Sequence, residues 1–159
     1  MKIRTIILSL SIALGFLLQA QRSPQDSWYL DRQIPLTGLP GLNQPYGIDF
    51  SDNGDLYVVD HGNDRISKWN SDGDFIKAWG GYGSADGQLN NPRDLAIGGG
   101  RIYVVEESGN RVQVFDMDGN FLMKWGSNGT EDGQFKNPHA IELTMNGNQV
   151  NEVFVAEWD

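Results

Sequence analysis

The sequence repeats itself at an interval of about 46 residues, and this repeat restricts the fold more than any other feature. The segment DGDFIKAWGGYGSADGQLNNP (72–92) aligns with DGNFLMKWGSNGTEDGQFKNP (118–138), and 11 of the 21 aligned positions are identical. Pro45, Pro92 and Pro138 open three successive units, 47 and 46 residues apart. Agreement of spacing and residue type at many positions indicates an array of similar structural units.

Each unit has the pattern of four short strands separated by tight turns. In the first unit the strands are expected at residues 47–50, 56–60, 65–69 and 75–79. They are filled by apolar, aromatic and β-branched residues, and Asn-Gly and Asp-Gly pairs mark the turns. Four antiparallel strands repeated about every 40 to 50 residues are typical of a β-propeller, an all-β fold whose blades are four-stranded sheets. Aromatic residues at matching positions are expected to pack between blades.

The chain divides into five predicted segments. Lys2 and Arg4 precede an apolar run that ends at the small residue Ala20, the pattern of a secretory signal peptide, with an uncleaved anchor as the alternative. Cleavage would leave a secreted or periplasmic protein without a membrane span. The segments are 1–20 (signal peptide), 21–44 (N-terminal segment with a ring-closing outer strand), 45–91 (first blade), 92–137 (second blade) and 138–159 (partial third blade).

Charge and cysteine content exclude several functions. The formal charge is −9, and removal of Lys2 and Arg4 with the signal peptide would make it two units more negative. A surface this acidic repels phosphate backbones, so nucleic-acid binding is not expected. The chain has no cysteine, which excludes disulfides and thiolate metal sites. Asn128 begins an Asn-Gly-Thr sequon that matters only in a eukaryotic host.

Two stretches carry a resemblance to a known family. YVVDHGNDRISKWNSDGDFIKAWG (57–80), followed by GQLNNP, and YVVEESGNRVQVFDMDGNFLMKWG (103–126), followed by GQFKNP, resemble the NHL-repeat β-propellers. The resemblance extends over residues 45–159. It implies that the sequence holds about two and a half blades of a ring that commonly has six. The chain is therefore expected to be a fragment, or to build a ring from several copies, and a lone copy is not expected to fold as a monomer.

The resemblance also implies structural roles. Arg65 and Arg111 are expected to pair with the acids that end the preceding strand, Asp60 and Glu106. Residues 28–45 resemble a fourth strand and its exit loop, and such a strand could close the ring by pairing with the last blade.

The candidate ligand-binding residues follow the three prolines directly. In a propeller, the loop before the first strand and the loop between the second and third strands lie around the same channel mouth. Tyr46, Arg93 and His139 are therefore predicted to converge there and to grip an anionic or polar ligand, with the arginine contacting a carboxylate. The alternative is that they are ordinary rim residues. The second-to-third-strand loops add His61, expected to be solvated, and Asn63, Asp64, Ser108 and Asn110.

The sequence leaves binding and catalysis both open. The favoured function is a scaffold for a protein, a peptide or a small polar ligand. The first alternative is an enzyme similar to the peptidyl-hydroxyglycine amidating lyase, whose Pro-His blade openings supply histidines to a central zinc; His139 in NPHAI (137–141) matches one opening. Zinc usually takes three protein ligands, so the others would lie beyond Asp159. A lactonase-like hydrolase is the second alternative. No cofactor is assigned, with zinc or calcium in a complete protein left open.

Overall fold

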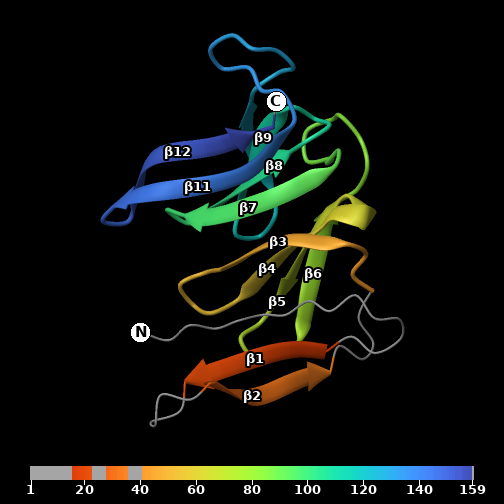
Figure 1. The fold of residues 1–159 in the computed structure, drawn as a ribbon, viewed down its shortest axis with the longest axis vertical. Helices are drawn as coiled ribbons and strands as arrows, with labels where there is room; N and C mark the ends of the chain where they lie inside the picture. Colours follow the sequence, from red (N-terminus) through yellow and green to blue (C-terminus); the bar gives the residue numbers. More distant parts are fainter. Residues whose placement is uncertain (1–15, 23–27, 36–40, 159) are drawn as a thin grey trace.

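The structure, a computed structural model, describes residues 16–22, 28–35 and 41–158, and these residues are almost entirely β-strand and turn. Four antiparallel sheets lie next to one another in chain order, the first at the bottom of Figure 1, the second above it, and the last two side by side at the top. Within the described residues, no helix has the length and apolar character that a bilayer crossing requires. The four antiparallel sheets confirm the all-β prediction.

The first two repeat units form the predicted four-stranded sheets. The first sheet contains β3 (Pro45–Phe50), β4 (Leu56–Asp60), β5 (Arg65–Trp69) and β6 (Phe75–Gly80). The second contains β7 (Pro92–Gly98), β8 (Arg101–Glu106), β9 (Arg111–Asp116) and β10 (Phe121–Trp125). In both sheets each strand pairs with its sequence neighbour, which is the up-and-down order of a propeller blade. A short 3-10 turn, η1 (His61–Asn63), connects β4 to β5.

The third unit and the N-terminal segment each form a hairpin. β11 (Pro138–Asn146) pairs with β12 (Gln149–Glu157), and these nine-residue strands are longer than those of the first two units. β1 (Phe16–Arg22) pairs with β2 (Trp28–Pro35) at the other end of the molecule (Figure 1). β2 lies where the outer strand was predicted. Among the described strands β2 pairs with β1 only, and ring closure stays a prediction. Most of the predicted signal peptide, residues 1–15, lies outside the described residues.

Apolar side chains fill the space between adjacent sheets. Tyr57 and Val59 of β4 face Ile102 and Val104 of β8, and all four side chains are fully buried with Phe115. The opposite face of the second sheet packs on the third unit through a second cluster that includes Val105 and Ile141. A central strand of a blade is therefore buried on both faces, which explains why LYVVD and RIYVVE are almost continuously apolar.

The repeated aromatic residues take the packing role that the sequence predicts. The Trp79 ring lies 6.2 Å from the Tyr57 ring and 6.3 Å from the Phe115 ring, which joins the first sheet to the second. Trp125 stands at the equivalent place one unit later and lies 6.4 Å from Tyr103. These edge-on and tilted contacts are the arrangements that aromatic pairs favour.

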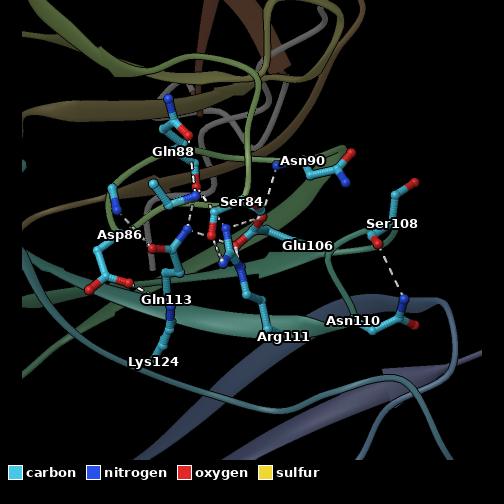
Figure 2. Close-up of polar contacts among 12 residues, drawn as sticks. Ser84, Asp86, Gln88, Asn90, Glu106, Ser108, Asn110, Arg111, Gln113 and Lys124 are labelled. Atoms are coloured by element: carbon cyan, nitrogen blue, oxygen red, sulfur yellow. Dashed lines mark hydrogen bonds and ion pairs between the residues drawn. The ribbon is translucent and has the colours of Figure 1, made fainter.

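The two predicted carboxylate–arginine pairs are present and structural. Arg65 Nε donates to Asp60 Oδ2 at 2.7 Å, and Arg111 Nε donates to Glu106 Oε1 at 2.7 Å. Figure 2 shows that Arg111 also donates to the backbone carbonyls of Ser84 and Gln88, at 2.8 and 2.9 Å. Arg111 thus fixes the loop that leads from the first blade to the second, and Arg65 donates to the Gly41 carbonyl, before the first blade, at 3.3 Å. Both acids are fully buried.

Left-handed residues hold consecutive units in register. Asn91 and Asn137, each directly before a unit's proline, have φ of 57° and 49°. The Asn91 N–H donates to Asp64 Oδ1 at 2.8 Å, and the Asn137 N–H donates to Asn110 Oδ1 at 3.1 Å. Asp64 and Asn110 are themselves left-handed, a conformation that Asn and Asp accept more readily than most residues.

Candidate functional site

The three post-proline residues lie in one row on the same face of the molecule. The Arg93 guanidinium carbon lies 4.7 Å from the centre of the Tyr46 ring, a cation–π contact between the first and second units. His139 of the third unit reaches the same arginine through Glu107, because His139 Nε2 lies 3.7 Å from Glu107 Oε1. The predicted convergence of Tyr46, Arg93 and His139 therefore depends on a residue that the sequence reading did not single out.

Each post-proline residue has a partner from its own unit. The Tyr46 and His61 rings meet edge to face at 4.5 Å, and the His139 and Trp158 rings stack at 5.1 Å. Between them, Arg93 forms its ion pair with Glu107. We refer to these six residues as the belt: Tyr46, His61, Arg93, Glu107, His139 and Trp158.

A sequence signal for the second half of the belt exists in the repeat. His61, Glu107 and Trp158 each follow directly after the acid that ends the second strand of a unit. Those acids are Asp60, Glu106 and Glu157. Alignment of YVVDH, YVVEE and FVAEW would have placed the three residues at one repeat position. Their difference in chemistry hides them from a search for identical residues.

His61 is not solvated, contrary to the sequence expectation. It is buried, and its Nδ1 lies 2.9 Å from the carbonyl oxygen of Pro92, the first residue of the next unit. The reason is the 3-10 turn η1, which folds the loop back so that the ring packs under Tyr46 and against β7. His61 therefore supports the belt from below, and Tyr46 is the exposed member of that pair, with 49% of its surface accessible.

The remaining loop residues predicted near the mouth make structural contacts. Asn63 Nδ2 donates to Asp60 Oδ2 at 2.9 Å. Ser108 Oγ accepts a hydrogen bond from Asn91 Nδ2 at 2.9 Å. Together with the inter-unit hydrogen bonds of Asp64 and Asn110 described above, these contacts hold the loop backbone in place. We therefore assign these four residues to the support of the belt.

The charge on Arg93 is largely compensated within the protein. Its Nε and Nη2 atoms lie 2.6 and 2.5 Å from the same oxygen, Glu107 Oε2, and both side chains are about four-fifths buried. The Asn91 side-chain amide lies 3.4 Å from that oxygen. A ligand carboxylate would have to compete with Glu107 for the Nε–Nη2 edge of the guanidinium.

The orientation of His139 is set by the backbone. Its Nδ1 lies 2.8 Å from the carbonyl oxygen of Asn137, and because a carbonyl accepts only, Nδ1 carries the proton of the neutral ring. Nε2 then presents a lone pair toward Glu107 and solvent. A histidine held in this way can accept a proton or a hydrogen bond, or ligate a metal.

The described residues do not complete a metal site. Among them, no three histidine, aspartate or glutamate side chains lie close enough together to hold an ion. His139 Nε2 and Glu107 Oε1 lie 3.7 Å apart, and two protein ligands fall short of the three that a catalytic zinc usually takes. Zinc at His139 would therefore need ligands from outside the described residues.

A cavity of about 440 Å³ lies at the opposite end of the sheets, between the hairpin turns of the three units. Its polar wall contains Lys68, whose Nζ lies 3.1 Å from Asp55 Oδ2 and 5.1 Å from the centre of the Tyr57 ring. Burial favours the neutral amine, but side-chain hydrogen bonds to Tyr57 and Asp55 and the negative charge of Asp55 outweigh it and raise the pKa of Lys68. Lys68 and Asp55 thus pair their charges within the wall of this cavity.

Comparison with known families identifies the repeat. Residues 89–115 match the NHL repeat, a span that holds β7, β8 and most of β9 together with Arg93 and Glu107. The chain contains an NHL repeat. The belt's central ion pair thus lies within the NHL repeat, and the Glu106–Arg111 pair is part of the same repeat. A comparison by sequence with curated proteins found no match.

Solved propeller structures resemble the fold of this NHL-repeat chain. A streptogramin B lyase has 16% identity and a TM-score of 0.54, over 82% of this chain and 41% of that chain. A catalytically inactive virginiamycin B lyase from Staphylococcus aureus, with quinupristin, has 15% identity and a TM-score of 0.52, over 89% and 48%. A Bacteroides uniformis protein provisionally named 6-phosphogluconolactonase has 17% identity and a TM-score of 0.53, over 82% and 43%.

At these identities the comparisons establish the fold alone. The four-stranded sheets match propeller blades, as the repeat predicted. The chain spans less than half the length of each of these three relatives.

Proposed function

We propose that this chain is part of an exported NHL-repeat propeller that binds a peptide, a protein or a small polar ligand at the belt. The observation that supports the proposal is the belt itself, in which six residues from three units contact one another on one face. Aromatic rings at its ends remain accessible, because Tyr46 is half exposed and Trp158 is 71% exposed. Accessible rings beside fixed polar groups are typical of binding surfaces.

The proposal is tested by calorimetric titration with the blocked tripeptide acetyl-Gly-Tyr-Gly-amide, whose aromatic side chain and uncharged ends suit such a surface. Tyr46→Ala should weaken binding about tenfold or more, because truncation of an aromatic anchor commonly costs over 1 kcal/mol. Tyr82→Ala is the matched control, since Tyr82 is an exposed tyrosine outside the belt. Equal affinity in both variants, or no binding of this peptide or any other ring-bearing probe, would count against the proposal.

A metal-dependent lyase is the second candidate, and the geometry of His139 supports it. Its Nδ1 is held by Asn137, so Nε2 is available as a base or a ligand. Added Zn²⁺ separates the two functions. The measurement uses an assembled propeller that contains this chain, because the remaining zinc ligands would come from outside the described residues. The binding proposal predicts that Zn²⁺ leaves the melting temperature of that propeller unchanged, whereas a zinc site that includes His139 would raise it in the wild type and not in His139→Ala.

A further inference from the structure

The class of ligand that the belt can bind depends on which of its charged groups are already paired within the protein. Arg93 is the cation that a ligand anion would seek, yet Glu107 bonds its Nε and Nη2 through one oxygen, at 2.6 and 2.5 Å. One face of the guanidinium lies over the Tyr46 ring. The protein's own side chains therefore use the Nε–Nη2 edge and one face of the guanidinium, and Glu107 compensates its positive charge. A ligand carboxylate could reach Arg93 only from the Nη1 side, without excess positive charge to attract it.

The field around the belt does not favour anions either. With both histidines counted as neutral, Arg93 and Glu107 cancel, and the whole chain carries a formal charge of −9. Asp64, whose carboxylate accepts from the backbone N–H of Asn91, adds negative charge beside the pair. An approaching cation is attracted by this distribution, and an approaching anion is repelled.

The surface that remains for a ligand is aromatic. Tyr46 and Trp158 are the most exposed members of the belt, and Trp158 stacks on His139. Aromatic faces attract planar rings and organic cations. The Glu107 carboxylate, one-fifth exposed, has a second oxygen that lies only 3.7 Å from His139 Nε2. This oxygen is the acceptor that a ligand ammonium or amide N–H group would meet.

From these observations we infer that Glu107 determines specificity and that the belt takes aromatic ligands that are cationic or neutral and excludes carboxylates. The inference rests on the proposed function, because it names the ligand class of the same site. The relevant residue is one that sequence reading passed over, since the sequence pointed to Arg93 as a carboxylate anchor.

The test uses two probes that share one ring, phenethylamine and phenylacetate, titrated into the full chain at neutral pH and low salt. The wild type should bind phenethylamine more tightly than phenylacetate. Glu107→Gln keeps the shape and hydrogen-bonding oxygen of the side chain and removes its charge. It should reverse the preference, with a change in the affinity ratio on the order of tenfold or more.

Two further variants complete the experiment. Glu152→Gln is the matched control, because it makes the same change at an exposed position of β12, five residues before the belt end of that strand. It should leave the preference unchanged. Arg93→Gln makes the reciprocal change, because it frees Glu107, and should increase the preference for phenethylamine. Circular dichroism of each variant establishes that it is folded. Glu107→Gln and Arg93→Gln should change the affinity ratio in opposite directions, so each tests the inference independently.

The inference would be overturned by a wild type that prefers phenylacetate, or by a Glu107→Gln variant with an unchanged ratio. Failure of phenethylamine to bind would also overturn it. In that case the blocked tripeptide separates the two proposals: if the tripeptide still binds in a Tyr46-dependent way, the ligand class is wrong and the binding function stands. If the tripeptide fails as well, the binding function fails too.

Discussion

At the scale of single residues, the stability lost when one partner of an ion pair is removed depends on how far the pair is buried. The Glu106 side chain is fully buried and its Arg111 partner is 10% exposed. The Lys124–Asp86 pair has a similar contact distance of 2.5 Å, but its side chains are 42% and 56% exposed. Figure 2 shows both pairs in the same region. Because removal of one partner leaves a buried charge uncompensated, the buried pair should be far more sensitive to substitution.

Arg111→Ala is therefore expected to lower the free energy of unfolding by about 3 to 5 kcal/mol. The loss includes the two hydrogen bonds to the loop carbonyls of Ser84 and Gln88. Lys124→Ala, the exposed control, should cost no more than about 1 kcal/mol. Urea denaturation measures both values. Arg111→Lys should fall between them, because it keeps the charge and loses the fork of donors. Similar losses in Arg111→Ala and Lys124→Ala would show that burial does not govern the pair.

At the scale of the elements, carboxylates join one inner strand to the next. Asp49 of β3 accepts a hydrogen bond from the Ile97 N–H of β7 at 2.7 Å. Asp94 of β7 accepts one from the Ile141 N–H of β11 at 3.1 Å. The first strand of each blade is the inner edge of its sheet and has a partner strand on one side only. The backbone N–H groups on its other side are therefore unpaired within the sheet. These aspartates cap that edge, and burial raises the pKa of both carboxyls.

The raised pKa values predict the direction of a pH effect on stability. The folded state holds the protons of Asp49 and Asp94 more tightly than the unfolded chain does, so their contribution is largest below the ordinary pKa of 3.8. It declines as the pH rises through the raised folded pKa values. The double variant Asp49→Asn, Asp94→Asn should show a shallower decline in melting temperature between about pH 4 and about pH 7 than the wild type.

A matched double variant controls for the loss of charge. Asp52 and Asp132 are exposed turn and loop residues, and Asp52→Asn with Asp132→Asn removes the same two charges. This control should keep the wild-type pH slope. If the two double variants have the same slope, the inner-strand carboxyls do not act as the structure implies.

The sequence predicts those features of the elements that recur at the same position in each unit, and it does not predict contacts made by residues that do not recur. The strand positions of the first unit were predicted to within two residues. Repetition extends the same four-strand scheme to the second unit, because it fixes which apolar segments are equivalent. The roles of Arg65 and Arg111 followed from the family resemblance. The links made by Asp49 and Asp94 were not predictable, since the two residues occupy different positions in their units and act across sheets. The burial of His61 was missed because it arises from the backbone turn of η1.

At the scale of the whole molecule, stacking of similar sheets places one residue pair of each unit on a common face. The structure places Tyr46, Arg93 and His139 as neighbours, as the repeat predicted, and adds His61, Glu107 and Trp158 from the adjoining loops. Equivalent positions in a repeat meet around an axis even when their chemistry differs. The position of the belt could thus be predicted from the repeat, whereas its internal pairing could not, because the pairing depends on three-dimensional contacts between different residue types.

The central claim is that ligands bind at the belt, and an NMR titration with acetyl-Gly-Tyr-Gly-amide tests it most directly. The ring Cε1–H signal of His139 and the indole N–H signal of Trp158 report on the belt, while the amides of residues 98–100 report on the cavity at the opposite end. Ligand binding at the belt should produce saturable shifts of the His139 and Trp158 signals that disappear in Tyr46→Ala. Shifts confined to the amides of residues 98–100 would contradict it and assign ligand binding to the opposite face.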